Sequence, residues 1–168
     1  MEPKQQLPPA TGEGPDVQAY TDLDLDKHIP YRIAHLSNSI RRSTTDRYVR
    51  DKDFSGREWR VLAMLGLHGP LTPTQLADLT AMDRATITRA VDRLTELGFC
   101  LRQPNQADSR SMWIKLSLDG EQQCSEIIPR LVWSGERCRS LFTKGEQVLL
   151  LELLDRLQKA LDDGLLMG

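Results

Sequence analysis

The sequence predicts a mostly α-helical protein that carries a single small β-hairpin. Three observations support this fold class. Two short helical patterns follow one another between residues 72 and 97, and a residue suited to capping precedes each of them. A polar turn then separates two strand-like segments, at residues 100–102 and 112–116. Further helical patterns lie before and after this stretch, so the order of elements is that of a winged helix-turn-helix with additional terminal helices.

The first short helix is expected to begin at about Pro73. Thr72, Pro73 and Gln75 have the spacing of a capping box with proline at the first helical position, an arrangement that satisfies free backbone N–H groups. Leu76 and Leu79 give this helix one apolar side.

The second helix is expected to begin after Asp83, which can cap it. Ile87, Val91 and Leu94 follow at offsets of four and three residues, the spacing of one buried stripe. Gly98 stands where a helix needs a left-handed residue to end, and strand-like character resumes after it. The segment therefore supplies two helices joined by a tight turn.

The residues between the buried positions of the second helix must face outward. Arginine can donate two hydrogen bonds to guanine or one to a phosphate, threonine offers a hydroxyl and a methyl group, and alanine allows close approach to bases. A solvated helix face is the alternative, but the capped helix in front favours recognition of DNA in the major groove. The residues expected to face the groove are Arg84, Ala85, Thr86, Thr88 and Arg89.

The polar turn between the two strand-like segments places Arg110 near the tip of a hairpin. An arginine held there can enter the narrow minor groove, where the negative potential is concentrated. Asp108 can orient its guanidinium through a bidentate pair. The alternative is an exposed ion pair worth about 1 kcal/mol or less. The position on the wing favours a contact with DNA.

In order and spacing, these motifs resemble the MarR family of bacterial transcriptional regulators. The resemblance covers nearly everything after about residue 28. It implies a homodimer that binds a pseudo-palindromic, double-stranded operator and releases it when a small ligand binds. A cytoplasmic location is expected separately, from the absence of a signal-like apolar run. The chain departs from many members at Ser109, where they carry a second wing arginine. The motifs are EWRVL at 58–62, LA at 76–77, DRATITR at 83–89, LGF at 97–99, DSRS at 108–111 and LSLDG at 116–120.

Four regions are expected along the chain. Residues 1–26 are acidic and rich in proline, with too little apolar periodicity to offset the entropy of ordering, so a disordered tail is predicted. Residues 27–54 are expected to form an N-terminal helix for dimerisation and ligand binding. Residues 55–116 are the predicted DNA-binding domain, and residues 117–168 the C-terminal dimerisation helices.

Charge is distributed unevenly over the 168 residues. A net charge of −2 is unusual for a DNA-binding protein, but residues 1–26 carry six acids and one lysine, which leaves +3 for the remainder. Residues 84–115 hold six basic and three acidic side chains where phosphate would lie. The placement of charge therefore agrees with DNA binding.

Capping signals predict the remaining helices. Ser55 and Thr143 each open a capping box, and Ser117 can cap a long helix that Pro129 should bend or divide. The last helix carries leucines on more than one face, which favours intertwined dimerisation over one thick core within a single chain. The apolar residues expected to support the winged module are Ile33, Leu36, Ile40, Trp59, Leu62, Leu65 and Leu67.

A small-molecule site is expected between the terminal helices and the winged module, because the resemblance implies it there. Its candidate residues offer the cationic, hydrogen-bonding and stacking groups that an aromatic carboxylate, or its thioester with coenzyme A, would use. The alternative is that Trp59 belongs to the core and the arginines to the surface. The candidates are Arg32, His35, Ser39, Trp59 and Arg60.

Other function classes find little support. The sequence has no GxSxG, phosphate-binding glycine loop or HExxH motif, so an enzyme is not expected, and no cofactor is predicted. No apolar run resembles a secretion signal or a membrane span. Two alternatives remain open: a winged helix that binds an acidic protein partner, and a redox-sensing repressor that uses Cys124 or Cys138. No metal site is expected.

Overall fold

The computed structural model describes residues 24–106 and 111–165, which divide into two units. One unit comprises residues 33–134 and contains the winged helix-turn-helix. The other comprises residues 1–32 and 135–168. Residues 1–23 of the expected tail lie outside the described residues.

The helices of the 33–134 unit begin where the capping signals predict. Helix α3 (Gly56–His68) follows Ser55, and helix α4 (Pro73–Thr80) follows Thr72; both caps are complete capping boxes. Helix α5 (Arg84–Glu96) is capped by Asp83, whose side chain accepts a hydrogen bond from the backbone of Thr86. Gly98, with φ at 77°, takes the left-handed conformation after the last turn. Local sequence therefore determined all of these boundaries.

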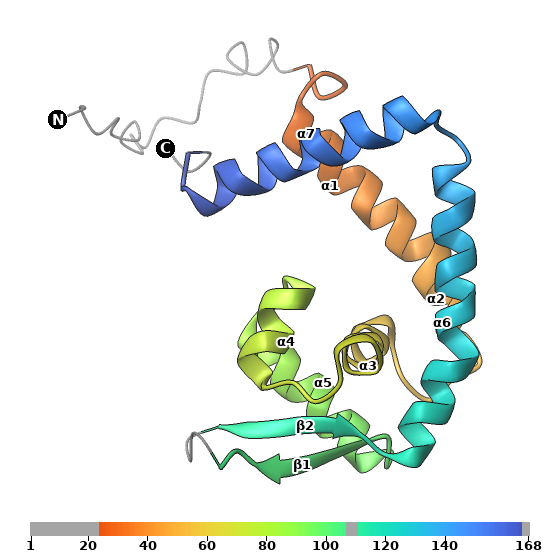
Figure 1. Ribbon diagram of the computed structural model, residues 1–168, viewed down its shortest axis with the longest axis vertical. Helices are drawn as coiled ribbons and strands as arrows, with labels where there is room; N and C mark the ends of the chain where they lie inside the picture. The colour runs from red at the N-terminus through yellow and green to blue at the C-terminus, as the bar shows by residue number, and fades with distance from the viewer. Residues whose placement is uncertain (1–23, 107–110, 166–168) are drawn as a thin grey trace, which may run out of the picture. The chain divides into compact units, whose positions relative to one another are not determined.

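Two antiparallel strands form the hairpin beside these helices. Strand β1 (Cys100–Pro104) pairs with strand β2 (Met112–Leu116), with Cys100 opposite Leu116. Leu71, in the loop before α4, adds a bridge to Ile114, with N···O distances of 3.0 and 2.8 Å in the two directions. Figure 1 shows α3, α4 and α5 together above the hairpin. The bridge fixes the loop between α3 and α4 to the wing.

The core lies between α3, α4, α5 and the hairpin and includes one side of helix α6 (Leu118–Arg139). Leu62, Leu76 and Ile127 are fully buried there. Two predictions of apolar sides were wrong. Leu79 on α4 and Leu67 on α3 are 47% and 56% exposed, because the helical stripe turns them away from this core.

Helix α6 begins as predicted and is not divided at Pro129. Ser117 caps it by accepting a hydrogen bond from Gly120 N at 3.1 Å. A proline removes one backbone N–H, but the rest of this 22-residue helix keeps its hydrogen bonds. Of the two outcomes predicted at Pro129, a bend or a division, the structure excludes the division.

The segment before α3 consists of helix α1 (Ile29–Ile40), the π-helical turn η2 (Arg41–Thr45) and the short helix α2 (Asp46–Val49). Tyr48 enters the core and donates a hydrogen bond to Arg130 O at 3.2 Å. The stripe of Ile33, Leu36 and Ile40 does not support the winged module, because all three side chains are exposed in this single chain.

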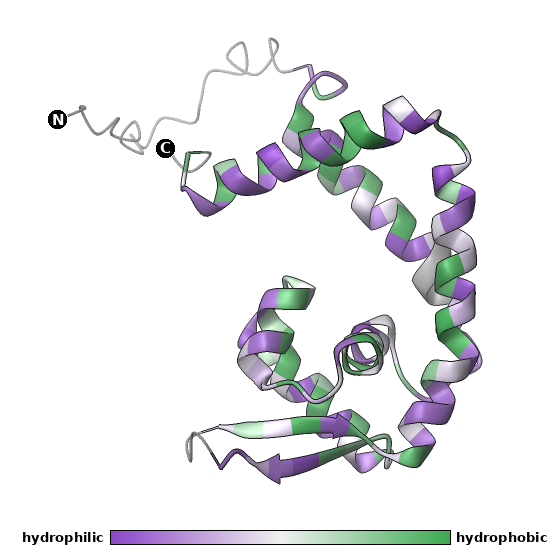
Figure 2. Ribbon diagram, in the orientation of Figure 1, coloured by the Kyte–Doolittle hydropathy of each residue, from purple (hydrophilic) through white to green (hydrophobic). Residues whose placement is uncertain are grey.

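Helix α7 (Lys144–Asp162), in the other unit, starts at the predicted Thr143 capping box. Apolar residues recur along it (Figure 2), yet it has no buried residue. Its broad leucine surface is therefore not covered within the described chain. No described helix is both long and apolar enough to cross a membrane.

Candidate nucleic-acid interface

Helix α5 has one buried side and one exposed side. Ile87, Val91 and Leu94, predicted as its buried stripe, are at most 2% exposed, and Ala90 lies with them. The stripe anchors α5 to α3 and α4, which it contacts. The opposite side of the helix is consequently fixed in direction and faces away from the core.

The predicted groove-facing residues lie on this opposite side. Arg84, Ala85, Thr88 and Arg89 are exposed, and Thr86 is half-buried. Thr88 donates from its hydroxyl to the carbonyl of Arg84 at 2.9 Å, which directs its methyl group and leaves its oxygen able to accept. The structure thus brings all five residues together on one face of the helix.

A short hydrogen-bonded chain orders the first turns of this face. Asp83 Oδ2 accepts a hydrogen bond from Thr86 Oγ1 at 2.7 Å, and Thr86 Oγ1 accepts one from Arg89 Nη2 at 3.2 Å. The hydrogen bond from the Thr86 hydroxyl and then that from its backbone N–H lower the pKa of the Asp83 carboxyl. The Asp83 carboxylate therefore orients the Thr86 hydroxyl, and this hydroxyl orients the Arg89 guanidinium.

The hairpin presents fewer described cations than expected. Asp108 and Arg110, the predicted wing pair, lie outside the described residues. Arg102 on β1 forms an ion pair with Asp92 on α5, so it ties the strand to the helix. Lys115 on β2 is half-buried. The roles of Asp108 and Arg110 remain predictions from sequence.

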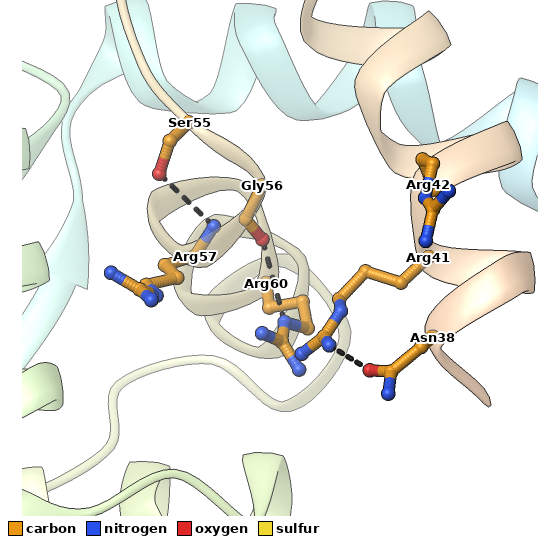
Figure 3. A pocket seen from close by; sticks show the side chains of 7 residues that line it. All are labelled: Asn38, Arg41, Arg42, Ser55, Gly56, Arg57 and Arg60. Atoms are coloured by element: carbon orange, nitrogen blue, oxygen red, sulfur yellow. Dashed lines mark hydrogen bonds between the residues drawn. The ribbon is translucent and has the colours of Figure 1, made fainter. Parts of the chain in front are cut away.

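A second cationic feature, the arginine cavity, lies at the start of α3. Its volume is about 470 Å³. Figure 3 shows the side chains that line it. Arg60 was a predicted ligand residue; the others were missed because their proximity depends on how η2 brings its arginines to α3. The only local signals were the Arg41-Arg42 pair and the three-residue spacing of Arg57 and Arg60. The lining residues are Asn38, Arg41, Arg42, Ser55, Gly56, Arg57 and Arg60.

The other predicted ligand residues do not line this cavity. Trp59 is 3% exposed and packs in the core, His35 is exposed, and Ser39 is half-buried. Arg32 belongs to the other unit, where it donates to Asp26 O at 3.2 Å. Of the five candidates, the structure places Arg60 alone in this cavity.

The cysteines show no reactive thiolate in the core. Burial raises the pKa of Cys100 to about 12 and that of Cys124 to about 11, so both are held as neutral thiols. Cys138 is exposed. Within the described residues, no group of three or more His, Cys, Asp or Glu side chains is arranged to hold a metal ion.

Comparisons with known proteins agree with this geometry. Residues 52–111 match the MarR family model. The multiple antibiotic resistance protein MarR of Salmonella typhimurium is 28% identical over 99 residues, covering 59% of this chain and 69% of that protein. The HTH-type transcriptional regulator PecS of Dickeya dadantii is 29% identical over 144 residues, covering 83% of this chain and 86% of PecS.

Solved structures share the fold. A MarR/EmrR family transcriptional regulator from Acinetobacter sp. ADP1 superimposes with a TM-score of 0.77 at 20% identity, covering 84% of this chain and 99% of its own. The PcaV regulator of Streptomyces coelicolor, solved in complex with its natural ligand, gives 0.67 at 18% identity, covering 82% and 96%. Residues 52–111, which contain the helix-turn-helix and its capped second helix, thus match the MarR family model, and the chain is similar in sequence to transcriptional regulators of that kind.

Proposed function

We propose that this chain is a MarR-type transcriptional regulator, a homodimeric repressor that binds a pseudo-palindromic operator and is released from it by a small anionic aromatic effector. The outward face of α5 carries the proposal. Arg84, Thr88 and Arg89 are exposed and Thr86 is half-buried, opposite a buried stripe, which is the arrangement of a recognition helix in a major groove. Arg84, Ala85, Thr86, Thr88 and Arg89 are the proposed base and phosphate contacts.

The wing supplies the second proposed contact. Arg110 would enter the minor groove with Asp108 orienting its guanidinium, because a hairpin tip can reach the groove beside the one that α5 occupies. The wing has Ser109 between these two residues, so each copy has one potential phosphate contact fewer than a wing with two arginines.

Exposed leucines on α7 support the homodimer. Leu149, Leu151 and Leu153 are 43 to 62% exposed in the single chain. Contact of this apolar surface with water is unfavourable, and association with a second copy would remove it. The two winged modules of the dimer would then bind half-sites about 10 base pairs apart. Dimerisation also explains how an effector could release DNA. A change in the distance between the two winged modules would misalign one of them with its half-site.

An anionic effector is supported by the arginine cavity, whose lining holds four cationic side chains and no carboxylate. The effector proposed from the sequence is a small aromatic carboxylate or its coenzyme A thioester. PcaV, which shares this fold, was solved in complex with its natural ligand, and this supports the proposal of an effector site. Of the contacts named from the sequence, Arg60 lines this cavity and is the proposed contact there. The roles of Arg32, His35, Ser39 and Trp59 stay predictions from the sequence.

A salt titration of operator binding tests this function. Fragments from the promoter of the chain's own gene are titrated with the full-length protein at several salt concentrations, and affinity should fall steeply as salt rises. Arg110→Ala should lower both the affinity and the slope, whereas Arg50→Ala, an exposed arginine outside both proposed sites, should change neither. Binding that is insensitive to salt and to Arg110→Ala would overturn the proposal.

A further inference from the structure

The arginine cavity combines charges from two separate segments of one unit. Arg41 and Arg42 come from η2, and Arg57 and Arg60 come from the first turns of α3. Figure 3 shows the side chains of Arg41 and Arg60 extending toward one another, with their guanidinium groups close together. The fold therefore holds like charges together at this point.

The described neighbours of these arginines compensate little of this charge. Arg41 donates to the neutral Oδ1 of Asn38, and Arg60 Nε donates to the carbonyl of Gly56 at 3.4 Å. None of the four arginines takes part in an ion pair between described side chains. Burial lowers the pKa of Arg60, and the charges of Arg41 and Arg57 lower it further. An anion in the cavity would compensate the positive charge of the arginines and reduce the repulsion between them.

The number of cations defines the kind of anion. A single carboxylate offers one negative charge and pairs with one guanidinium fork. Four arginines match a ligand with charge on adjacent groups and acceptor oxygens on several sides, as in a diphosphate. A cavity of about 470 Å³ is also larger than a single small ion requires.

We propose that the arginine cavity binds a small molecule that carries a diphosphate group. Arg41 and Arg60, whose guanidinium groups lie close together, bind the diphosphate jointly, and Arg42 and Arg57 supply flanking charge. This inference deepens the function proposed above, and its regulatory meaning rests on that function. The shared chemistry is the diphosphate, which a free nucleotide and a coenzyme A thioester both contain.

The position of the cavity suggests how ligand binding there could affect DNA binding. The ligand would join η2 to the start of α3, and α3 packs directly against α5. Neutralising Arg41 and Arg60 removes the repulsion between the two segments, so their preferred separation changes when the ligand binds. Any shift of α3 is transmitted to α5 through the side chains packed between them.

Calorimetric titration of the full-length protein without DNA tests the proposal. Inorganic pyrophosphate, ADP and coenzyme A are titrated at one ionic strength, with sulfate and benzoate for comparison. Pyrophosphate should bind about tenfold or more tightly than sulfate or benzoate, because it engages more than one guanidinium. Coenzyme A binding more tightly than ADP would support the thioester as the source, and the reverse order would support a free nucleotide.

Variants locate the binding. Arg41→Met and Arg60→Met keep the apolar stem and remove the charge, and each should weaken pyrophosphate binding by about tenfold or more. Arg60→Lys should retain part of the affinity, and it keeps the test usable if a methionine variant does not fold. Arg50→Met is the matched control and should bind as the parent does.

Two results would overturn the proposal: equal affinity of the parent protein for pyrophosphate and sulfate, or unchanged pyrophosphate affinity in folded Arg41→Met and Arg60→Met. Because the titration contains no DNA, such a failure leaves operator binding untouched. Conversely, a protein that bound no operator would still give the diphosphate signal.

Discussion

Arg89 Nη2 donates to Thr86 Oγ1 at 3.2 Å on the exposed side of α5, and the same hydroxyl donates to Asp83 Oδ2 at 2.7 Å. The residue that caps the helix is thereby linked to the arginine proposed to reach DNA. A capping interaction that stabilises the helix also limits the directions that the arginine can take.

Replacing Arg89 with alanine should reduce operator affinity by about 1–3 kcal/mol without loss of folding. Arg89 is exposed and contributes nothing to the core, so the melting temperature should stay within about a degree or two of the parent value. Fluorescence anisotropy with labelled operator measures the affinity. Arg93→Ala is the control on the same helix, because Arg93 is engaged with Glu96 at 3.4 Å. A large fall in melting temperature for Arg89→Ala would contradict the assignment.

Thr86→Val should weaken operator binding even though valine has nearly the shape of threonine. The substitution removes the hydroxyl that accepts from Arg89, so the guanidinium loses its fixed direction. Thr86→Ser keeps the hydroxyl and should restore most of the affinity. Comparing the two variants on operator and on a scrambled duplex measures the loss of discrimination. Equal affinities for the two variants would argue against a positioning role.

Gly120→Ala should destabilise the fold. A Cβ at Gly120 would overlap the carbonyl oxygen of Phe99, which already accepts a hydrogen bond from Ser117 N at 3.0 Å. We expect a loss of about 1–3 kcal/mol in the free energy of unfolding, measured by urea denaturation. Gly145→Ala is the matched control, because Gly145 is also helical and a Cβ there meets nothing. That variant should be neutral or slightly stabilising.

Stability should fall in acid. The side chains of Thr86 and Lys52 lower the pKa of Asp83 and Glu126, and the backbone N–H of Thr143 lowers that of Glu146. A carboxyl whose pKa is lower in the folded than in the unfolded chain stabilises the fold at any pH above its ordinary pKa, here 3.8 or 4.5. That contribution is lost as the pH falls through the pKa of the folded state.

The melting temperature should therefore be flat near neutral pH and decline below about pH 4. Glu126→Gln removes the interaction with Lys52, so its decline should be shallower than that of the parent. The exposed Glu152→Gln serves as the control. A steeper decline for Glu126→Gln would show that the sign of this contribution is wrong.

Leu154→Glu should convert the proposed dimer to a monomer. Leu154 is 44% exposed on α7, so the substitution costs the single chain little but would place a charge in the interface. Sedimentation velocity at micromolar concentration measures the change, with Asp155→Asn as the control. Operator affinity should fall with the loss of the second winged module. A parent protein that sediments as a monomer would refute the dimer itself.

The sequence determined the local elements of this protein. Each cap that begins α3, α4, α5 and α7 follows from residues within a few positions of one another, and so does the buried stripe on α5. Because the stripe fixes which side of α5 is buried, it also fixed which residues face outward. The five proposed groove contacts could therefore be named from spacing alone.

Tertiary structure decided what depends on distant segments. The bridge from Leu71 to Ile114, the burial of Trp59 and the exposure of Leu79 depend on how the helices pack, and helical spacing does not encode that packing. The arginine cavity is the clearest case. Arg41 and Arg60 are separated by a turn, a short helix and a loop, and only the folded chain brings their charges to face one another.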